Sequence, residues 1–235
     1  MSSEELINRI KSKGYWRVEI RPTIFDERRI PTFSKARELV QSCRVQWRGW
    51  DYPHWNENSV RNISDWVESQ EDWEQYIEYW RFYRSGQFVH LFALREDYLD
   101  LDEVLPTQYP ARTPRVGYVS FVSTTYKVTE IFEFASRLAN KDVLHPSAFI
   151  SVGLYNLKDH ELASFGANRY LHDGYVYTKD DPIVIEREVP QDKLVANPDN
   201  FALDFIIDIF EHFNWNNPPR QILAEDQKRL RERRL

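Results

Sequence analysis

The densest group of residues that could do chemistry is the run 47–55, WRGWDYPHW. Arg48, Asp51 and His54 could form a polar cluster where a strand ends, and Trp50 would add an aromatic surface to it. Asp51 could also orient the His54 imidazole as a general base. The alternative is a structural turn, in which Asp51 caps backbone amides and the tryptophans close one edge of the core. The sequence leaves both interpretations open.

A second group of such residues lies on an expected β-hairpin. The strands Tyr76–Tyr83 and Phe88–Leu94 are aromatic and β-branched, and residues 84–87, RSGQ, join them. A two-residue turn at Ser85 and Gly86 would place Arg81 opposite His90. Side chains alternate along strands, so one face would carry four apolar residues of the core: Trp80, Phe82, Val89 and Leu91. The other face would then carry Arg81 and His90, framed by Tyr79, Tyr83, Phe88 and Phe92.

Arginine and histidine on an aromatic face predict a binding partner, because buried polar groups need hydrogen bonds. The partner could be an anionic or planar ligand, which Arg81 would contact by donating hydrogen bonds while the aromatic rings stack. It could instead be a carboxylate within the chain, for which Asp51, Glu19 and Glu78 are candidates. The predicted binding residues are thus Arg48, Trp50, His54, Tyr79, Arg81, Tyr83 and His90, and the candidates for acid–base catalysis are His54, His90 and Asp51.

Composition excludes several classes of function. The net charge of −6 argues against a protein that grips duplex nucleic acid through a general basic field, although a local basic groove is compatible with it. Cys43 is the single cysteine and the six histidines lack ligand spacing, so we expect neither disulfides nor a metal site. No cofactor can be named. A signal-like N-terminus and a long apolar run are both missing, which predicts a cytoplasmic protein without a membrane partner.

Known catalytic motifs are also missing from the sequence. It has no P-loop, no Gly-x-Gly-x-x-Gly, no Gly-x-Ser-x-Gly and no His-Glu-x-x-His. The one acidic-x-Lys triplet, residues 226–228, falls on the expected terminal helix, where we read it as a solvated face. We read His160 and His172 as surface residues. The basic end, residues 228–234, could touch a nucleic acid or an acidic partner, or be solvated.

The periodicity of apolar residues predicts an α+β fold, an antiparallel sheet with hairpins packed against several helices. We expect one domain over residues 1–218 and a charged C-terminal helix or tail over 219–235. A long loop is expected at Asp97–Pro114. The expected helices are Ser3–Lys13, Ser34–Cys43, Thr129–Asn140 and Pro198–Phe213. Further strands are expected at Tyr15–Arg21, Arg44–Arg48, Val116–Thr124 and Ile183–Val189, with a second hairpin of Ala148–Leu157 and Glu161–Phe165 turned at Lys158-Asp159.

Residues 48–54, RGWDYPH, together with residues 80–90, WRFYRSGQFVH, resemble a pattern found in uncharacterised prokaryotic proteins. The later part of the chain, through the Phe201–Trp215 helix, is loosely similar to segments that accompany Schlafen-type AlbA_2 domains. The pattern covers less than half of the chain, and the AlbA_2 domain itself is not recognisable. The resemblance implies a prokaryotic origin, a partner protein and a role in regulation or anti-phage defence. It transfers no catalytic residue.

These observations lead to one predicted function and two alternatives. The prediction is a binding or interaction module that recognises a nucleotide, a single-stranded nucleic acid or a partner protein through its Arg/His/aromatic residues. The first alternative is a nuclease or nucleotide hydrolase that uses histidine acid–base chemistry. The second is a scaffold subunit whose aromatic surface is an oligomer interface, for instance in a homo-oligomer.

Overall fold

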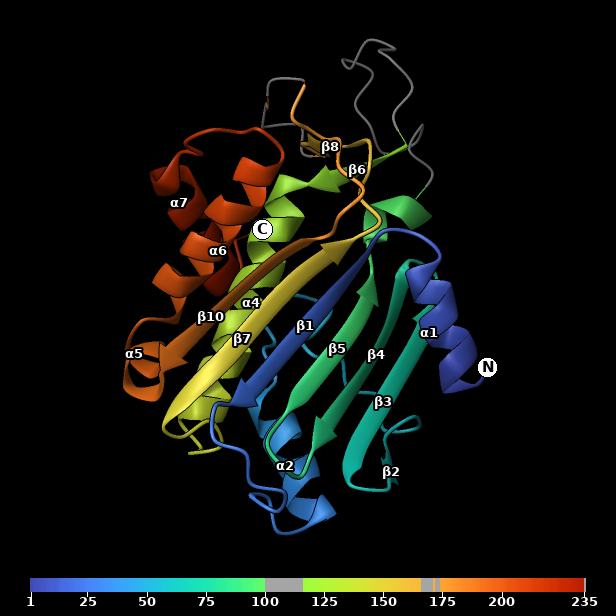
Figure 1. The fold of residues 1–235 in the computed structure, drawn as a ribbon, viewed down its shortest axis with the longest axis vertical. Helices are drawn as coiled ribbons and strands as arrows, with labels where there is room; N and C mark the ends of the chain where they lie inside the picture. The colour runs from blue at the N-terminus through green and yellow to red at the C-terminus, as the bar shows by residue number, and fades with distance from the viewer. Residues whose placement is uncertain (100–115, 166–170, 172–173, 235) are drawn as a thin grey trace.

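A seven-stranded antiparallel sheet organises the fold (Figure 1). The computed structural model describes residues 1–99, 116–165, 171 and 174–234. The strand order is β10-β7-β1-β5-β4-β3-β2. The bounds are β1 Tyr15–Pro22, β2 Arg61–Ile63, β3 Trp66–Trp73, β4 Tyr76–Tyr83, β5 Phe88–Ala93, β7 Ser147–Tyr155 and β10 Ile183–Pro190. A smaller sheet contains β6 Gly117–Ser120, β8 His160–Ala163 and β9 Val176–Tyr177. This arrangement confirms the predicted α+β class.

Helices cover the two faces of the large sheet unequally. In Figure 1, α4 and α6 lie behind the sheet and α1 lies in front of it. The bounds are α1 Ser3–Lys11, α2 Phe33–Cys43, α4 Phe121–Ala139, α5 Gln191–Ala196, α6 Pro198–His212 and α7 Arg220–Arg231, with a short 3-10 helix η1 at Arg95–Tyr98. The main core lies on the α4 side and a smaller cluster, which includes Leu6, Ile10 and Tyr79, lies under α1. None of the helices in the described ranges is long and apolar enough to cross a membrane.

The elements with strong local signals are confirmed. Helix α1 begins at a capping box, in which the Ser2 hydroxyl accepts a hydrogen bond from the Glu5 amide and Glu5 accepts one from the Ser2 amide. Strands β1 and β10 and helix α6 also lie where the sequence places them. Helix α2 is confirmed too, although Thr32 caps it in place of the expected Ser34.

The predicted pairing of β4 with β5 is wrong by one residue. Phe82 lies opposite Phe88, and Trp80 lies opposite His90. The Tyr83 amide donates a hydrogen bond to the Gln87 carbonyl, so residues 84–86 form the connection in place of the two residues assumed. Gly86 takes a positive φ of 88° in this connection. A one-residue shift moves a whole set of side chains to the other face of the sheet. His90 therefore lies on the α4 face, and Arg81 lies on the opposite face.

Helix α4 begins earlier than the sequence predicts. Residues 121–124 were expected to continue a strand, but β6 ends at Ser120, whose hydroxyl caps the helix by accepting from the Ser123 amide. The threonines of this segment fit the helix because Thr125 Oγ1 donates to the Phe121 carbonyl and Thr129 Oγ1 donates to the Thr125 carbonyl. The earlier start adds Lys127 and its neighbours to the helix.

Two other expectations on strands are wrong. Residues 147–155 and 160–163 do not form a hairpin, because β7 pairs with β1 and β10 while β8 pairs with β6 and β9. Residues 44–48 do not form a strand and make a single bridge, between Val45 and Tyr52. Strand β3 was not expected from the sequence. Most of the expected 97–114 loop lies outside the described residues.

The C-terminal helix α7 packs against α4 and α6. Asp226 and Gln227 are buried on it, so the prediction that residues 226–228 form a solvated face is wrong for these two residues. The Gln227 amide donates a hydrogen bond of 3.0 Å to Thr129 Oγ1 of α4. The expected helix within residues 219–235 is therefore a packed element of the fold.

Candidate ligand-binding pocket

A pocket of about 590 Å³ opens where the first turns of α4 meet one end of β4 and β5. This volume falls within the range of small-molecule sites. The segment 48–50 and the turn between β3 and β4 complete its walls. Its lining residues are Trp16, Arg48, Gly49, Trp50, Trp73, Glu74, Gln75, Tyr76, Ile77, Glu78, Phe92, Ala93, Leu94, Arg95, Glu96, Ser123, Thr124 and Lys127.

One wall of the pocket is a group of stacked aromatic rings. The ring centroids of Trp50 and Tyr76 are 4.4 Å apart, and Trp73 lies 5.8 Å from each of them. Trp73 pairs with Tyr76 across the β3–β4 turn, where Glu74 takes a positive φ of 53°. The short turn therefore sets two rings side by side. Trp73 keeps 51% of its surface exposed, so the wall is open to a ligand.

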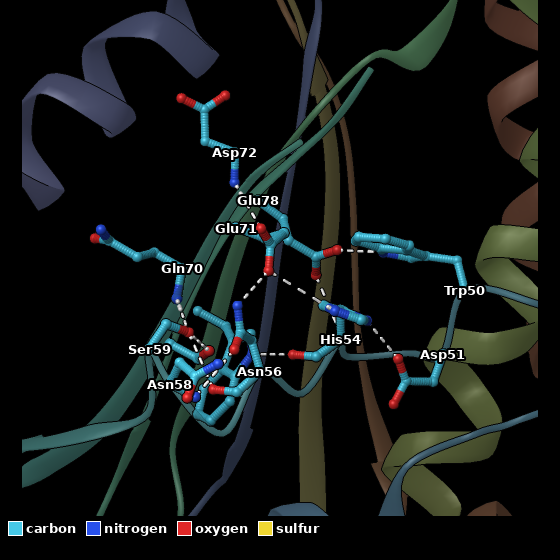
Figure 2. Close-up of polar contacts among 12 residues, drawn as sticks. Trp50, Asp51, His54, Asn56, Asn58, Ser59, Gln70, Glu71, Asp72 and Glu78 are labelled. Atoms are coloured by element: carbon cyan, nitrogen blue, oxygen red, sulfur yellow. Dashed lines mark hydrogen bonds and ion pairs between the residues drawn. The ribbon is translucent and has the colours of Figure 1, made fainter. Parts of the chain in front are cut away.

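Glu78 on β4 holds Trp50 in this wall (Figure 2). Its Oε1 accepts a hydrogen bond of 2.6 Å from the Trp50 indole, and its Oε2 accepts one of 3.3 Å from the His54 amide. Oε2 also lies 2.8 Å from His90 Nε2, although these atoms are not aligned for a hydrogen bond. Burial alone would raise the pKa of Glu78, but His90, the Lys127 charge and Trp50 together lower it to about 2. An ionised carboxylate thus ties the 48–54 segment to the sheet.

Asp51 and His54 form a pair behind Trp50. His54 Nδ1 lies 2.6 Å from Asp51 Oδ1, and the His54 ring stacks on Trp50 with centroids 3.8 Å apart. Arg44 holds the other Asp51 oxygen at 2.6 Å, and Glu71 Oε2 lies 3.9 Å from His54 Nε2. Burial would lower the pKa of His54, but Asp51, Glu78 and Glu71 raise it. The surroundings therefore favour the imidazolium, which suits an acid better than the base expected from the sequence.

Cations also line the pocket. Arg48 donates two hydrogen bonds, of 2.7 and 2.6 Å, to the two oxygens of Glu130, whose side chain is fully buried. Lys127 Nζ lies 3.7 Å from Glu130 Oε2. Burial lowers the pKa of Lys127 and the Arg48 charge adds to this effect, against the Glu130 and Glu78 carboxylates, which raise it. Ser123 and Thr124 line the pocket beside these groups, in the first turns of α4, where the helix dipole favours anions.

Glu96 adds a second kind of carboxyl group to the pocket. It lies on η1 and is 5% exposed. Burial raises its pKa to about 7, against the opposing effects of backbone hydrogen bonds and the Arg95 charge. Glu96 and Glu78 thus line one pocket in different protonation states at neutral pH, the first partly protonated and the second ionised.

The structure brings together part of the predicted site. Arg48 and Trp50 line the pocket, and His54 and Asp51 support Trp50 from behind. His90 lies beneath Glu78 and is buried. Glu78, one of the carboxylates predicted as a partner, lies beside His90. Arg48 pairs with Glu130, a partner that the sequence did not suggest.

The other predicted residues, Tyr79, Arg81 and Tyr83, lie on the opposite face of the sheet. The Arg81 guanidinium lies 4.7 Å from the Trp66 ring and its Nε lies 3.5 Å from Glu68. The Tyr79 hydroxyl donates a hydrogen bond of 2.5 Å to the same carboxylate. Arg81 and His90 do not meet, because the register places them on different faces.

Sequence reasoning missed most of the pocket. Trp73 belongs to the missed strand β3, and Lys127 to the part of α4 that was read as strand and loop. The sequence feature that indicates the earlier start of α4 is the four-residue spacing of Phe121, Thr125 and Thr129. This spacing continues the helical period of the apolar residues later in α4. Of the two histidines read as surface residues, His160 is buried at 2% exposure and lies 3.0 Å from Asp97, so that prediction is wrong; His172 lies outside the described residues.

Comparisons with known proteins found no matching family model, no matching curated protein and no matching solved structure. Over the residues that the structure describes, no cluster of three or more His, Cys, Asp or Glu side chains could hold a metal ion.

Proposed function

We propose that this protein is a binding module that recognises a nucleotide in the pocket between α4 and the β3–β4 turn. One observation carries the proposal: stacked aromatic rings and cationic side chains line a single cavity of about 590 Å³. Nucleobases stack on Trp and Tyr rings without a positive field over the whole protein. Phosphates bind to cations and to the amides of a helix N-terminus.

Lys127 is one of three cationic residues that line the pocket, with Arg48 and Arg95, and it lies closest to the start of α4. Arg48 already donates two short hydrogen bonds to Glu130, whereas Lys127 Nζ lies 3.7 Å from the same carboxylate. Lys127 also lies on α4 one turn after Ser123 and Thr124, which line the same pocket. A phosphate near these residues would gain both the lysine charge and the helix dipole.

The cavity favours a small molecule over a polymer. Its volume suits a single ligand, and the net charge of −6 opposes the approach of a long polyanion. Among the ligands that the sequence suggested, a nucleotide therefore fits this pocket better than a single-stranded nucleic acid. A role in regulation or anti-phage defence would require such a ligand to control a partner protein.

Isothermal titration calorimetry with nucleoside mono-, di- and triphosphates, and with the parent nucleosides, tests the proposal. We expect at least one nucleotide to bind more tightly than its nucleoside. Trp73→Ala should weaken that binding by about 1–3 kcal/mol, the usual contribution of one base–aromatic stack. Phe25→Ala is the matched control, because Phe25 is 78% exposed and lies outside the pocket lining. Absence of binding by every nucleotide, or equal affinities of the two variants, would contradict the proposal.

Hydrolysis of the bound nucleotide is a second candidate function. The observation in its favour is the Asp51–His54 contact of 2.6 Å beside Trp50. However, His54 is not among the residues that line the pocket, and so the geometry favours binding. Turnover of a nucleotide panel, with and without Mg²⁺, that disappears in His54→Ala would support the second candidate.

A further inference from the structure

The turn between β3 and β4 places two polar side chains at the rim of the aromatic wall. Trp73 pairs with Tyr76 across this turn, so Glu74 and Gln75 are the only residues between the two stacked rings. Both residues line the pocket. Over the described part of the chain, no hydrogen bond or ion pair engages either side chain. Their polar atoms are therefore available to a ligand.

Glu74 has a backbone conformation that glutamate rarely adopts. Its φ of 53° lies in the left-handed region, which glycine adopts without strain and in which asparagine and aspartate are enriched among the other residues. A glutamate in this conformation costs stability that a glycine would not. Among the described residues, no polar contact of the Glu74 side chain offsets this cost. The observation therefore points to a role of this side chain toward a ligand.

The chemistry of these two side chains matches one nucleobase better than the others. A base that stacks on Trp73 presents its edge to the residues beside the ring, which are Glu74 and Gln75. A carboxylate only accepts hydrogen bonds, and it does so through two adjacent oxygens. The Watson–Crick edge of guanine carries two adjacent donors, N1–H and the 2-amino group, next to the acceptor O6. The carboxylate can accept from both donors while the Gln75 amide donates to O6.

We propose that the pocket selects guanine nucleotides and that Glu74 is the residue that reads the base. The inference rests on the proposed function, because it concerns the edge of the same stacked base. Adenine has a lone pair at N1, where guanine has N1–H, and would set this acceptor against a carboxylate oxygen. Cytosine and uracil each present a single donor group on this edge. Guanine is thus the base that can engage both oxygens of Glu74 at once.

Calorimetric titration of the full-length protein with GMP, IMP and AMP tests this proposal. The three ligands share the sugar, the phosphate and the purine ring, and IMP lacks only the 2-amino group of GMP. We expect GMP to bind at least about tenfold more tightly than IMP or AMP, because one hydrogen bond to a charged group is typically worth a factor of this size. In Glu74→Gln the affinities for GMP and AMP should become similar. Glu27→Gln is the matched control, since it makes the same change at an exposed residue outside the pocket lining.

A second variant, Glu74→Gly, separates recognition from folding. Glycine adopts the positive φ without strain, so the urea midpoint should stay close to that of the wild type while the preference for GMP disappears. A clearly lower midpoint would assign Glu74 a structural role and overturn the proposal. A preference for GMP that persists in Glu74→Gln or in Glu74→Gly would also overturn it.

The same titrations distinguish this inference from the proposed function. If the wild type binds GMP and AMP equally, and both more tightly than their nucleosides, the selection of guanine is refuted and the pocket is still a nucleotide site. If no nucleotide binds, both proposals are refuted.

Discussion

Replacing Arg48 by Met should destabilise the protein, because it leaves a buried carboxylate without its main partner. The Glu130 side chain is fully buried, and it accepts two hydrogen bonds from the Arg48 guanidinium. Removing one partner of a buried ion pair typically costs about 3–5 kcal/mol. Arg48 is 21% exposed and Lys127 lies 3.7 Å from Glu130, so Lys127 can take over part of the pairing. We therefore expect a loss of about 2–4 kcal/mol in the free energy of unfolding.

Urea unfolding followed by far-UV circular dichroism measures this loss. The matched control is the double variant Arg48→Met/Glu130→Met, which removes both charges and keeps the volume of the side chains. It should recover most of the lost stability, since replacing a whole buried pair by apolar residues is often neutral. A loss below about 1 kcal/mol for Arg48→Met, or a double variant less stable than the single one, would refute the reasoning, because a surface ion pair behaves in that way.

Three further predictions concern residues around the pocket. Because Asp51, Glu78 and Glu71 raise the pKa of His54, its contribution to stability is present below its unfolded pKa of about 6.5 and is lost as the pH rises through the folded value. The urea midpoint should accordingly fall with rising pH in the wild type, and less so in His54→Gln; parallel profiles would contradict this. Trp50→Phe removes the indole donor to Glu78 and should cost about 1–3 kcal/mol in urea unfolding. Arg81→Ala should cost at most about 1 kcal/mol, because Arg81 is 32% exposed, and should leave nucleotide affinity unchanged in calorimetry, since it lies on the opposite face of the sheet.

The sequence predicted the features that depend on local contacts. The Ser2 cap and the first-turn glutamates fix the start of α1 within a few residues of chain. The Asp51–His54 contact likewise joins residues three positions apart, and so it could be proposed before the structure was known. Features of this kind need no knowledge of how distant segments pair.

The pocket depends instead on long-range contacts that local patterns do not specify. Arg48 and Glu130 are 82 positions apart, and they meet because α4 begins at Phe121 and runs behind the sheet. The pairing of β4 with β5 is shifted by one residue from the assumed register. This shift places Arg81 and His90 on opposite faces of the sheet. Trp73 reaches the pocket through β3, whose polar residues Glu68, Ser69 and Gln70 hide its strand pattern.

A nucleotide in the proposed pocket would contact Trp50 and Trp73 as well as Lys127. The indole N–H signals of these two tryptophans in ¹H–¹⁵N spectra test this contact directly, with Trp50→Phe and Trp73→Phe providing their assignment. Titration with the best-binding nucleotide should shift both signals and leave that of Trp215, which stacks on Tyr175 and Phe210, in place. A nucleotide that shifts Trp215 but neither Trp50 nor Trp73, or a nucleotide panel that shifts none of them, would contradict the account.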